Sequence, residues 1–292
     1  MLRIALPNKG RLAEDARELF ADAGLPVRAR GERALTASLG GEFEAIFVRA
    51  GDIPEFVADG AADAGITGWD LVAESERTLD SLLDLEFGRC RLVVAAREES
   101  GIATLADIQG APRVATAFPR ATRRFFADAG REVEIVPVSG AVEIAPRLGI
   151  ADVVVDLTET GSTLRVNGLR EVATILTSTA RLVARPGATS RDGDADAARR
   201  CALRELVDAL ASVLHARGKR YLMANVPRDA LARVKEIVPG LNGPTVIDIM
   251  NGGRFVAVHS VVAAGQVYRT IAELKAIGAA GILVTRIERL MP

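Results

Sequence analysis

Short apolar runs typical of β-strands alternate with helical patterns through most of this 292-residue chain. The first apolar run, residues 2–6, is followed by residues 10–24, whose apolar positions recur at helical spacing. The same order continues with apolar runs at residues 44–50 and 63–67, which are separated by a helical pattern at residues 53–60. Strands and helices that alternate in this way predict an α/β fold with largely parallel strands.

A second set of alternating elements begins near residue 91. It has strand patterns at residues 89–97, 112–118, 133–138 and 151–157 and helical patterns at residues 121–130 and 141–149. The chain returns through the apolar residues 171–186, and the polar, glycine-containing residues 187–197 indicate a linker before a long helix at residues 195–217. We therefore predict a first lobe made of residues 1–90 and 180–218, and a second lobe made of residues 91–179.

The last segment predicts a separate domain at residues 219–292. Its strand patterns lie at residues 220–226, 245–250, 254–262 and 280–290, and its helical patterns lie at residues 227–238 and 266–278. Asn251, Gly252 and Gly253 tolerate a positive φ and predict a hairpin between the two middle strands. The resulting order, βαββαβ, is that of a ferredoxin-like α+β domain.

The composition argues against several classes of function. With 37 Lys and Arg against 38 Asp and Glu, the formal charge is -1, which leaves no global basic field to hold nucleic acid or an anionic membrane. The few cysteines and histidines lack metal-ligand spacing and indicate no structural metal: Cys90, Cys201, His215 and His259. Because only a short apolar run precedes Pro7, we expect no signal peptide, no membrane span and a cytoplasmic location.

Residues 156–163, with the sequence DLTETGST, combine two acids and several hydroxyls with one glycine. A glycine turn at the start of a helix aims backbone N–H groups at one point, and the helix dipole adds positive potential, which suits a phosphate. Asp156 and Glu159 would repel a bare phosphate, so they suit ribose hydroxyls or a divalent cation. A ligand with ribose hydroxyls beside a phosphate satisfies both requirements. The alternative is a strand end followed by an ordinary capped helix.

The wider segment from Glu143 to Leu164 resembles the signature of the ATP phosphoribosyltransferase family. The matching positions are Glu143, Gly149, Ala151, Val154, Asp156, Leu157, Thr160, Gly161, Thr163 and Leu164. The resemblance extends to LPNKGRL at residues 6–12, to DAGITGWD at residues 63–70 and, by architecture, to the whole chain. It departs at Thr158, where the family frequently has an apolar residue. The length and the C-terminal domain are similar to the long form of the family; the short form relies on a separate partner protein.

The resemblance implies a two-lobed, periplasmic-binding-protein-like catalytic core and a C-terminal ACT-like domain. Such enzymes condense ATP with phosphoribosyl pyrophosphate in the first step of histidine biosynthesis, with Mg²⁺ carried mainly by substrate phosphates. The implied phosphoribosyl pyrophosphate site comprises Asp156, Thr158, Glu159, Thr160, Gly161, Ser162 and Thr163. The implied ATP and pyrophosphate site comprises Lys9, Arg11, Arg49, Asp70 and Glu143. No general acid, base or nucleophile is assigned.

Most residues of the second group also have a purely structural interpretation. Lys9 and Arg11 fall where a helix begins and oppose its dipole, which a bound anion would resolve; the alternative is a solvated turn. Arg49 follows a strand, at the end where open α/β sheets bind ligands. Asp70 is also suited to cap the following helix, and Glu143 lies where the dipole of the helix predicted at residues 141–149 favours an acid.

The resemblance further implies that histidine, the end product, inhibits the enzyme through the C-terminal domain and shifts it between homo-oligomers, dimers and hexamers. The matching effector positions are Asn225, Leu241, Thr245 and Gly281, although some members have an acid where Asn225 stands. Two alternatives stay open: a two-lobed ligand-sensing protein without turnover, and a phosphoribosyltransferase for another base. Leu157, in place of a second adjacent acid after Asp156, favours the ATP-specific family.

Overall fold

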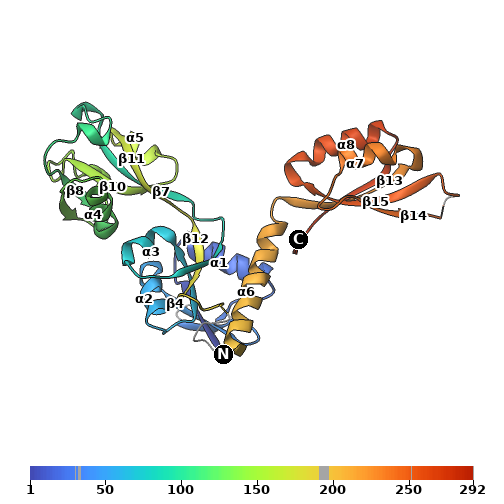
Figure 1. The fold of residues 1–292 in the computed structure, drawn as a ribbon, viewed down its shortest axis with the longest axis horizontal. Coiled ribbons are helices and arrows are strands. Elements are labelled where there is room, and N and C mark those ends of the chain that lie inside the picture. The colour runs from blue at the N-terminus through green and yellow to red at the C-terminus, as the bar shows by residue number, and fades with distance from the viewer. Residues whose placement is uncertain (30, 32–33, 191–196, 251, 292) are drawn as a thin grey trace. The chain divides into compact units, whose positions relative to one another are not determined.

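The computed structural model describes residues 1–29, 31, 34–190, 197–250 and 252–291. Most of the predicted linker at residues 187–197 and Asn251 of the predicted hairpin lie outside these described residues. The chain divides into two compact units, the first spanning Met1–Ala21 and Leu25–Val207 and the second Asp22–Gly24 and Asp208–Pro292. The first unit holds two β-sheets, which we call the first and second lobes with their helices, and the second unit holds one sheet (Figure 1).

The sheet of the first lobe has seven strands in the order β2-β3-β4-β1-β5-β12-β6. These strands are Leu2–Pro7 (β1), Arg28–Ala29 (β2), Thr36–Ser38 (β3), Phe43–Val48 (β4), Ala64–Gly68 (β5), Asp80–Asp84 (β6) and Ala180–Ala184 (β12). Only the central strand β1 pairs in parallel, with β4 and β5; the hairpin pairs β2-β3-β4 and the returning β12 are antiparallel. The sheet is therefore mixed, and the prediction of largely parallel strands was wrong at its margins, where hairpins and the chain return add antiparallel neighbours.

Four helices accompany this sheet: Arg11–Asp22 (α1), Ile53–Ala58 (α2), Trp69–Ser75 (α3) and Ala197–Ala216 (α6), together with the 3₁₀ turn Ala50–Asp52 (η1). Helix α1 buries the apolar positions that its spacing predicts, including Leu19 and Phe20. Helix α2 packs so closely on β5 that a Cβ at Gly65 would lie 2.5 Å from Ile53 Cγ2. Glycine is therefore required at that contact. Helix α6 continues across the boundary between the two units.

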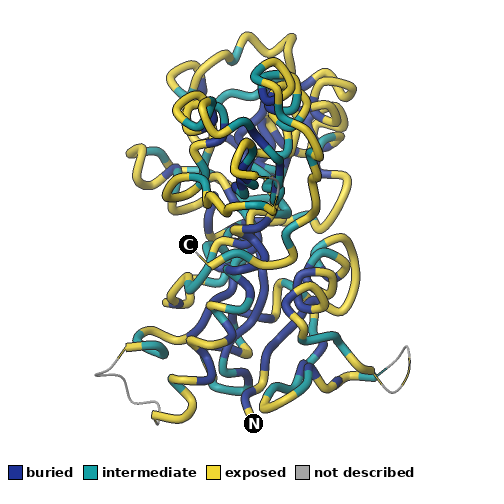
Figure 2. Tube along the Cα trace, turned by 90° about the vertical axis from the view of Figure 1, so that its right-hand side faces the viewer, coloured by how far each residue is buried: buried dark blue, intermediate teal, exposed yellow. Residues whose placement is uncertain are grey.

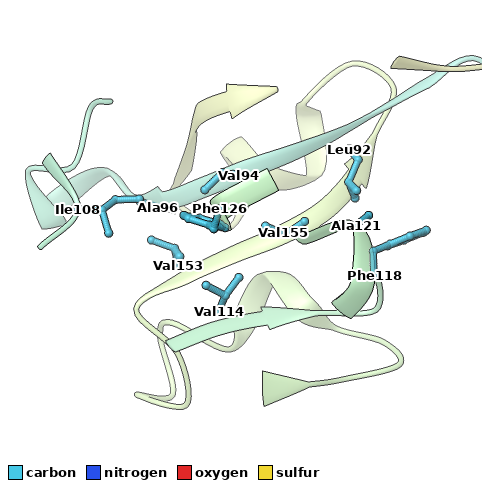
Figure 3. Close-up of a cluster of buried hydrophobic side chains, with 10 residues drawn as sticks. All are labelled: Leu92, Val94, Ala96, Ile108, Val114, Phe118, Ala121, Phe126, Val153 and Val155. Carbon is cyan, nitrogen blue, oxygen red and sulfur yellow. The ribbon is translucent and has the colours of Figure 1, made fainter. Parts of the chain in front are cut away.

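The sheet of the second lobe has five strands in the order β11-β7-β10-β8-β9. They are Cys90–Arg97 (β7), Arg113–Thr116 (β8), Glu134–Pro137 (β9), Val153–Thr158 (β10) and Leu169–Ser178 (β11). Its helices are Pro119–Asp128 (α4) and Ser162–Val166 (α5), with 3₁₀ turns at Glu98–Ser100 (η2), Leu105–Asp107 (η3) and Val142–Ile144 (η4). Val153 and Val155 lie in the core cluster drawn in Figure 3, and Val154 lies in a second cluster. Burial on both faces explains the continuous valine run.

The helix predicted at residues 141–149 is absent from the described structure. This segment forms only the 3₁₀ turn η4 and a series of turns that end at Gly149, whose φ is 69°. Pro146 removes a backbone N–H that an α-helix would need, and Ala141 takes the left-handed conformation with a φ of 51°. The chain before Pro146 therefore stays a single 3₁₀ turn.

Two neighbouring backbone segments connect the lobes. Strand β7 leaves the first lobe and β11 returns to it, and Cys90 at the start of β7 pairs with Ser178 at the end of β11. The returning chain is fastened to the departing chain by hydrogen bonds from Ala180 N–H to Phe87 O and from Leu85 N–H to Ala180 O, both 2.9 Å long. The two-lobed α/β core that the sequence predicted is thus confirmed.

The second unit has the predicted βαββαβ order, which confirms the ferredoxin-like domain. Its strands are Lys219–Pro227 (β13), Thr245–Asp248 (β14), Phe255–Ala263 (β15) and Ala280–Arg286 (β16), in the sheet order β14-β15-β13-β16. Its helices are Leu231–Ile237 (α7) and Val267–Ala276 (α8), with 3₁₀ turns at Arg228–Ala230 (η5) and Ala264–Gln266 (η6). Alternate residues of β13 and β15 are buried with Val234 and Leu274 of the helices, and Figure 2 shows the buried stretches of the chain. In the described part of the chain, no helix is long and apolar enough to cross a membrane.

Candidate active site

A tight turn joins β10 to α5 and forms the hydroxyl-rich loop. Gly161 is the N-cap of α5 and has a φ of 75°. Its N–H donates a 2.8 Å hydrogen bond to Oγ1 of Thr158, a side chain that is only 8% exposed. The hydroxyl of Thr158 thus serves the turn itself, which explains why a polar residue is tolerated at this buried position.

The side chains beyond the turn face solvent beside the start of α5. Thr160, Ser162 and Thr163 are exposed, and Thr160 Oγ1 lies 3.0 Å from Ser162 Oγ. The first N–H to bond back within α5 is that of Arg165, which donates to Gly161 O at 3.1 Å. The N–H groups of the preceding residues in the first turn have no partner inside the helix. The Gly161 and Ser162 N–H groups donate within the turn, to Thr158 Oγ1 and Thr160 Oγ1, so the turn offers its exposed hydroxyls and the remaining N–H groups of the first helical turn.

An ion pair between the edge strand β11 and its neighbour β7 lies beneath this turn. Arg91 of β7 donates two hydrogen bonds to Glu171 of β11, at 2.5 and 2.9 Å. These bonds and the charge of Arg165 lower the pKa of Glu171. A Cβ at Gly161 would lie 2.8 Å from Glu171 Oε1 and 3.0 Å from Arg165 Nη1, the ends of two flexible side chains, and the φ of 75° favours glycine here. Sequence reasoning missed Arg91 and Glu171, which are 80 residues apart and carry no local pattern.

Asp156 lies in β10, and a second acid, Glu143, lies in the 3₁₀ turn η4 that contacts this strand. Asp156 is partly buried, which raises the pKa of its carboxyl group; a 2.8 Å hydrogen bond from the Leu157 N–H opposes this shift, and the charge of Glu143 adds to it. Glu143 therefore lies close enough to Asp156 for their charges to interact, in the second lobe rather than among the cations of the first. Paired carboxylates at this position are suited to accept hydrogen bonds from hydroxyl groups.

The first lobe gathers its predicted ligands at one sheet edge. Strands β1, β4 and β5 run in parallel, so their carboxyl ends lie at the same edge. Lys9 and Arg11 follow β1, Arg49 follows β4, and Asp70 follows β5. The three cations are exposed. Carboxyl ends of parallel strands are where open α/β sheets bind ligands, and this edge carries positive charge suited to an anion.

Asp70 differs from its exposed neighbours because it is only 5% exposed. The Ser178 hydroxyl donates a 2.6 Å hydrogen bond to Asp70 Oδ1 and accepts one of 2.9 Å from the Asp70 N–H. Burial raises the pKa of the Asp70 carboxyl. The interpretation of Asp70 as the N-cap was wrong: α3 begins at Trp69 with Gly68 as its N-cap, and Asp70 lies in the first turn with its carboxylate bonded to Ser178 of the other lobe.

One contact connects the sheet edges of the two lobes. Arg11 Nη1 lies 3.4 Å from Glu159 Oε2, with these side chains 73% and 56% exposed. An exposed ion pair contributes at most about 1 kcal/mol to stability, so it marks proximity more than strength. The cationic edge of the first lobe and the hydroxyl-rich loop of the second thus lie next to each other.

Comparison with known proteins identifies the family of such a chain. The family model described as ATP phosphoribosyltransferase matches residues 49–212, and the model described as the HisG C-terminal domain matches residues 216–289. This chain belongs to the ATP phosphoribosyltransferase family. It is 68% identical to the ATP phosphoribosyltransferase of Gemmatimonas aurantiaca and 49% identical to that of Natronomonas pharaonis, in both cases over the whole of each chain.

A solved structure supports the fold of this ATP phosphoribosyltransferase. The ATP phosphoribosyl transferase (HisG:HisZ) complex from Thermotoga maritima matches with a TM-score of 0.64 and 29% identity over 74% of this chain and 99% of that one. The predictions of a glycosyltransferase, of its place in histidine biosynthesis and of the long form, with its own C-terminal domain, are therefore confirmed. The family match favours a transferase over the alternative of a ligand-sensing protein without turnover.

The site of this phosphoribosyltransferase offers no thiolate nucleophile. Cys90 lies at the start of β7, where burial and the charge of Asp70 raise the pKa of its thiol to about 11. The thiol is therefore protonated at neutral pH, and only thiolates are good nucleophiles. Among the described residues, no group of three or more His, Cys, Asp or Glu side chains could hold a metal ion.

The four predicted effector residues lie in the C-terminal domain of this transferase. Asn225 of β13 pairs with Ala257 and Ala280, and a Cβ at Gly281 would lie 3.1 Å from Asn225 Nδ2. Thr245 begins β14, and Leu241, in the preceding turn, is 47% exposed. The structure brings Asn225 and Gly281 into contact, while two strands, β15 and β13, separate Thr245 of β14 from Gly281 of β16.

Proposed function

We propose that this enzyme joins adenine N1 of ATP to the anomeric carbon of phosphoribosyl pyrophosphate and releases pyrophosphate. The observation that carries the proposal is the pairing of a cationic sheet edge with a loop that offers N–H groups, hydroxyls and two acids. The first suits polyphosphate, and the second suits a ribose 5-phosphate with free hydroxyls. One ligand set without the other would fit a simpler nucleotide-binding protein.

In this proposal the protein's residues position both substrates and stabilise the leaving group. The first turn of α5 and Thr163 bind the 5-phosphate, and Asp156, with Glu143 beside it, accepts hydrogen bonds from the ribose hydroxyls. Lys9, Arg11 and Arg49 hold the pyrophosphate and the triphosphate and balance the charge that develops as the C–O bond breaks. Alignment of two bound reactants supplies much of the rate enhancement without a covalent intermediate.

Asp156 and Glu143 could supply only part of the coordination of a magnesium ion, and the substrate would have to supply the rest. Asp156 and Glu143 offer oxygen donors of the type Mg²⁺ prefers, but two carboxylates need further oxygens to complete six-fold coordination. Substrate phosphates and water would supply these oxygens. A bound Mg²⁺ would neutralise charge on the departing pyrophosphate.

We further propose that residues 219–292 form a regulatory domain that binds histidine through Asn225, Leu241, Thr245 and Gly281. The outward edge strands support an assembly of homodimers and hexamers. All residues of β14 are exposed, as are most of β16, and Ile247 and Leu283 are 47% and 60% exposed. Unpaired edges and exposed apolar side chains are suited to association with further copies of the chain.

Turnover of ATP with phosphoribosyl pyrophosphate and magnesium is expected, and saturating L-histidine is expected to suppress it. The measurement is a steady-state assay with added pyrophosphatase, which follows the ultraviolet change on substitution at adenine N1. Turnover that histidine does not suppress would support the proposed transferase activity and contradict its inhibition by histidine. If histidine changed neither activity nor oligomeric state, the regulatory proposal would be refuted.

The same assay on the Gly281→Val variant tests the proposed histidine site. Gly281 has a φ of 58°, and a side chain there would meet the amide of Asn225. The variant should need a higher histidine concentration for half inhibition. Gly265→Val is the control, because no atom lies within 4 Å of a Cβ at that position of the same domain.

Replacing Thr163 with valine is expected to raise the KM for phosphoribosyl pyrophosphate about tenfold and to leave the KM for ATP within about twofold. The exposed Thr163 hydroxyl stands in the first turn of α5, where it can bind a phosphate, and valine keeps its shape without the hydroxyl. Initial rates with each substrate varied in turn measure the difference. Thr163→Ser, which keeps the hydroxyl, should behave like the parent enzyme; equal effects of valine on both substrates would contradict the assignment.

A further inference from the structure

Helix α3 follows β5 of the first lobe but is attached to the second lobe. Its first residue, Trp69, donates a 3.0 Å hydrogen bond from its N–H to Thr179 O, directly after β11. Asp70 binds Ser178, the last residue of β11. The next residue, Leu71, packs against the core cluster of the second lobe shown in Figure 3. The N-terminal half of α3 is therefore held by the strand that returns from the second lobe.

The C-terminal half of α3 caps a helix of the second lobe. The N-cap of α4, Phe118, provides no side-chain hydrogen bond, and Pro119 at the first helical position has no N–H. The first N–H groups of α4 therefore belong to Arg120 and Ala121. Glu74 accepts both, at 3.1 Å from Arg120 N to each carboxylate oxygen and 2.9 Å from Ala121 N to Oε2. A carboxylate at this end also interacts favourably with the helix dipole.

The contact is made in both directions. The Arg120 guanidinium reaches back to the carbonyl oxygen of Glu74 at 3.4 Å and to Glu76 Oε2 at 3.7 Å. Glu76 touches none of the N–H groups of α4, so Glu74 alone satisfies these donors. Helix α3 thus carries a carboxylate that completes the hydrogen bonding of an element 46 residues away in the other lobe.

The capped end of α4 lies at the substrate edge of the second lobe. Helix α4 follows β8, which runs parallel to β10, with Thr116 paired to Val155. The carboxyl ends of β8 and β10 therefore share one edge, and the loop at residues 159–161 follows β10 there. Glu74 consequently ties the first lobe to the edge that carries the hydroxyl-rich loop.

We propose that Glu74 is a positioning residue that fixes the alignment of the two lobes, and through it the alignment of the two substrates. The inference rests on the proposed function, in which ATP and the ribose phosphate are bound mainly by different lobes. A displacement of about 1 Å between reactants can lower the rate about 100-fold without loss of either binding site. Loss of the cap should therefore affect kcat more than either KM.

The test compares Glu74→Ala with Glu76→Ala, which removes an equal charge two residues away on the same segment. Glu74→Ala is expected to lower kcat about tenfold and to change each KM by less than about threefold. Its Arg120 and Ala121 amides should exchange with deuterium faster, by mass spectrometry of peptides that cover residues 118–123. Glu76→Ala should keep the parent kcat and the parent exchange rates. Glu74→Gln, which keeps one acceptor, should fall between Glu74→Ala and the parent.

The outcomes separate the proposals. A folded Glu74→Ala with parental kcat, or with parental exchange at residues 118–123, would overturn the positioning role. A fall in kcat that Glu76→Ala reproduces would also overturn it, because charge alone would then explain the effect. If Glu74→Ala does not fold, Glu74→Gln carries the same test. Absence of turnover in the parent enzyme would instead refute the proposed function, while the exchange measurement would still report on the cap.

Discussion

Gly161→Ala is expected to lower kcat/KM for phosphoribosyl pyrophosphate about 100-fold in an enzyme that still folds. Gly161 has a φ of 75°, and a non-glycine residue in that conformation costs about 1–2 kcal/mol. The new Cβ would also lie 2.8 Å from Glu171 Oε1, so either the turn or the Arg91–Glu171 pair must shift. Because two hydrogen bonds from Arg91 hold the Glu171 carboxylate in place, we expect the turn to shift and its N–H groups to change direction.

The matched control for this prediction is Gly168→Ala. Gly168 has a φ of 67° and follows α5 in the same segment, but no atom lies within 4 Å of a Cβ there. It therefore carries the same backbone strain without the clash. Initial rates and thermal unfolding of both variants measure the effect. Equal losses of activity would show that backbone strain, and not the ion pair beneath the turn, is responsible.

Asp156→Asn is expected to lower kcat/KM for phosphoribosyl pyrophosphate about 100-fold or more and, at neutral pH, to raise the melting temperature slightly, by about 2 °C. The activity falls because the amide presents an N–H₂ donor and a weaker acceptor to the ribose hydroxyls. The stability rises because burial and the charge of Glu143 disfavour the ionised carboxylate. An asparagine oxygen can still accept the Leu157 N–H.

The pH dependence of stability distinguishes this explanation from a change in packing. The pKa of Asp156 is raised in the folded state, so its favourable contribution is present below the unfolded pKa of about 3.9 and is lost as pH rises through the folded pKa. The stability gain of Asp156→Asn should therefore grow as pH rises from about 4 to 7, in urea unfolding. Glu132→Gln, at an exposed site in the same lobe, controls for net charge. A gain independent of pH would contradict the burial argument.

The periodicity of the sequence predicted the fold because burial decides it. The valine run before Asp156 and the helical spacing of α1 report which faces are covered, and both lobes and the βαββαβ domain follow from such patterns. Strand direction was less predictable. Antiparallel pairing of β12 with β5 depends on where the chain returns after the second lobe, which no local pattern records.

The two local errors have a common physical origin. The segment at residues 141–149 has helical spacing, but Pro146 lacks the N–H that the helix would need. Asp70 has the residue type of a cap, but a serine 108 residues later offers its carboxylate a better partner. The first error comes from a hydrogen bond that proline cannot make, and the second from a hydrogen bond to a residue distant in sequence. In each case that one bond outweighs the general propensity of the segment.

The loop from Asp156 to Thr163 was predictable because its chemistry is contiguous in sequence. The supports of this loop were not, since Arg91, Glu171 and Glu143 come from other strands and turns. Glu74 illustrates the same limit. Its role depends on the N-cap residue Phe118, which has no side-chain acceptor and so leaves the N–H groups of Arg120 and Ala121 to an external carboxylate.

The adjacent departure and return of the chain make the second lobe an insertion. Cys90 and Ser178 are paired neighbours, so the first sheet would be continuous if a short turn replaced everything between them. An inserted lobe whose ends are adjacent can become longer or shorter, or be replaced, without altering the strand register of the first sheet. The hydroxyl-rich loop could thus change together with the second lobe, while the cationic edge of the first lobe stayed the same.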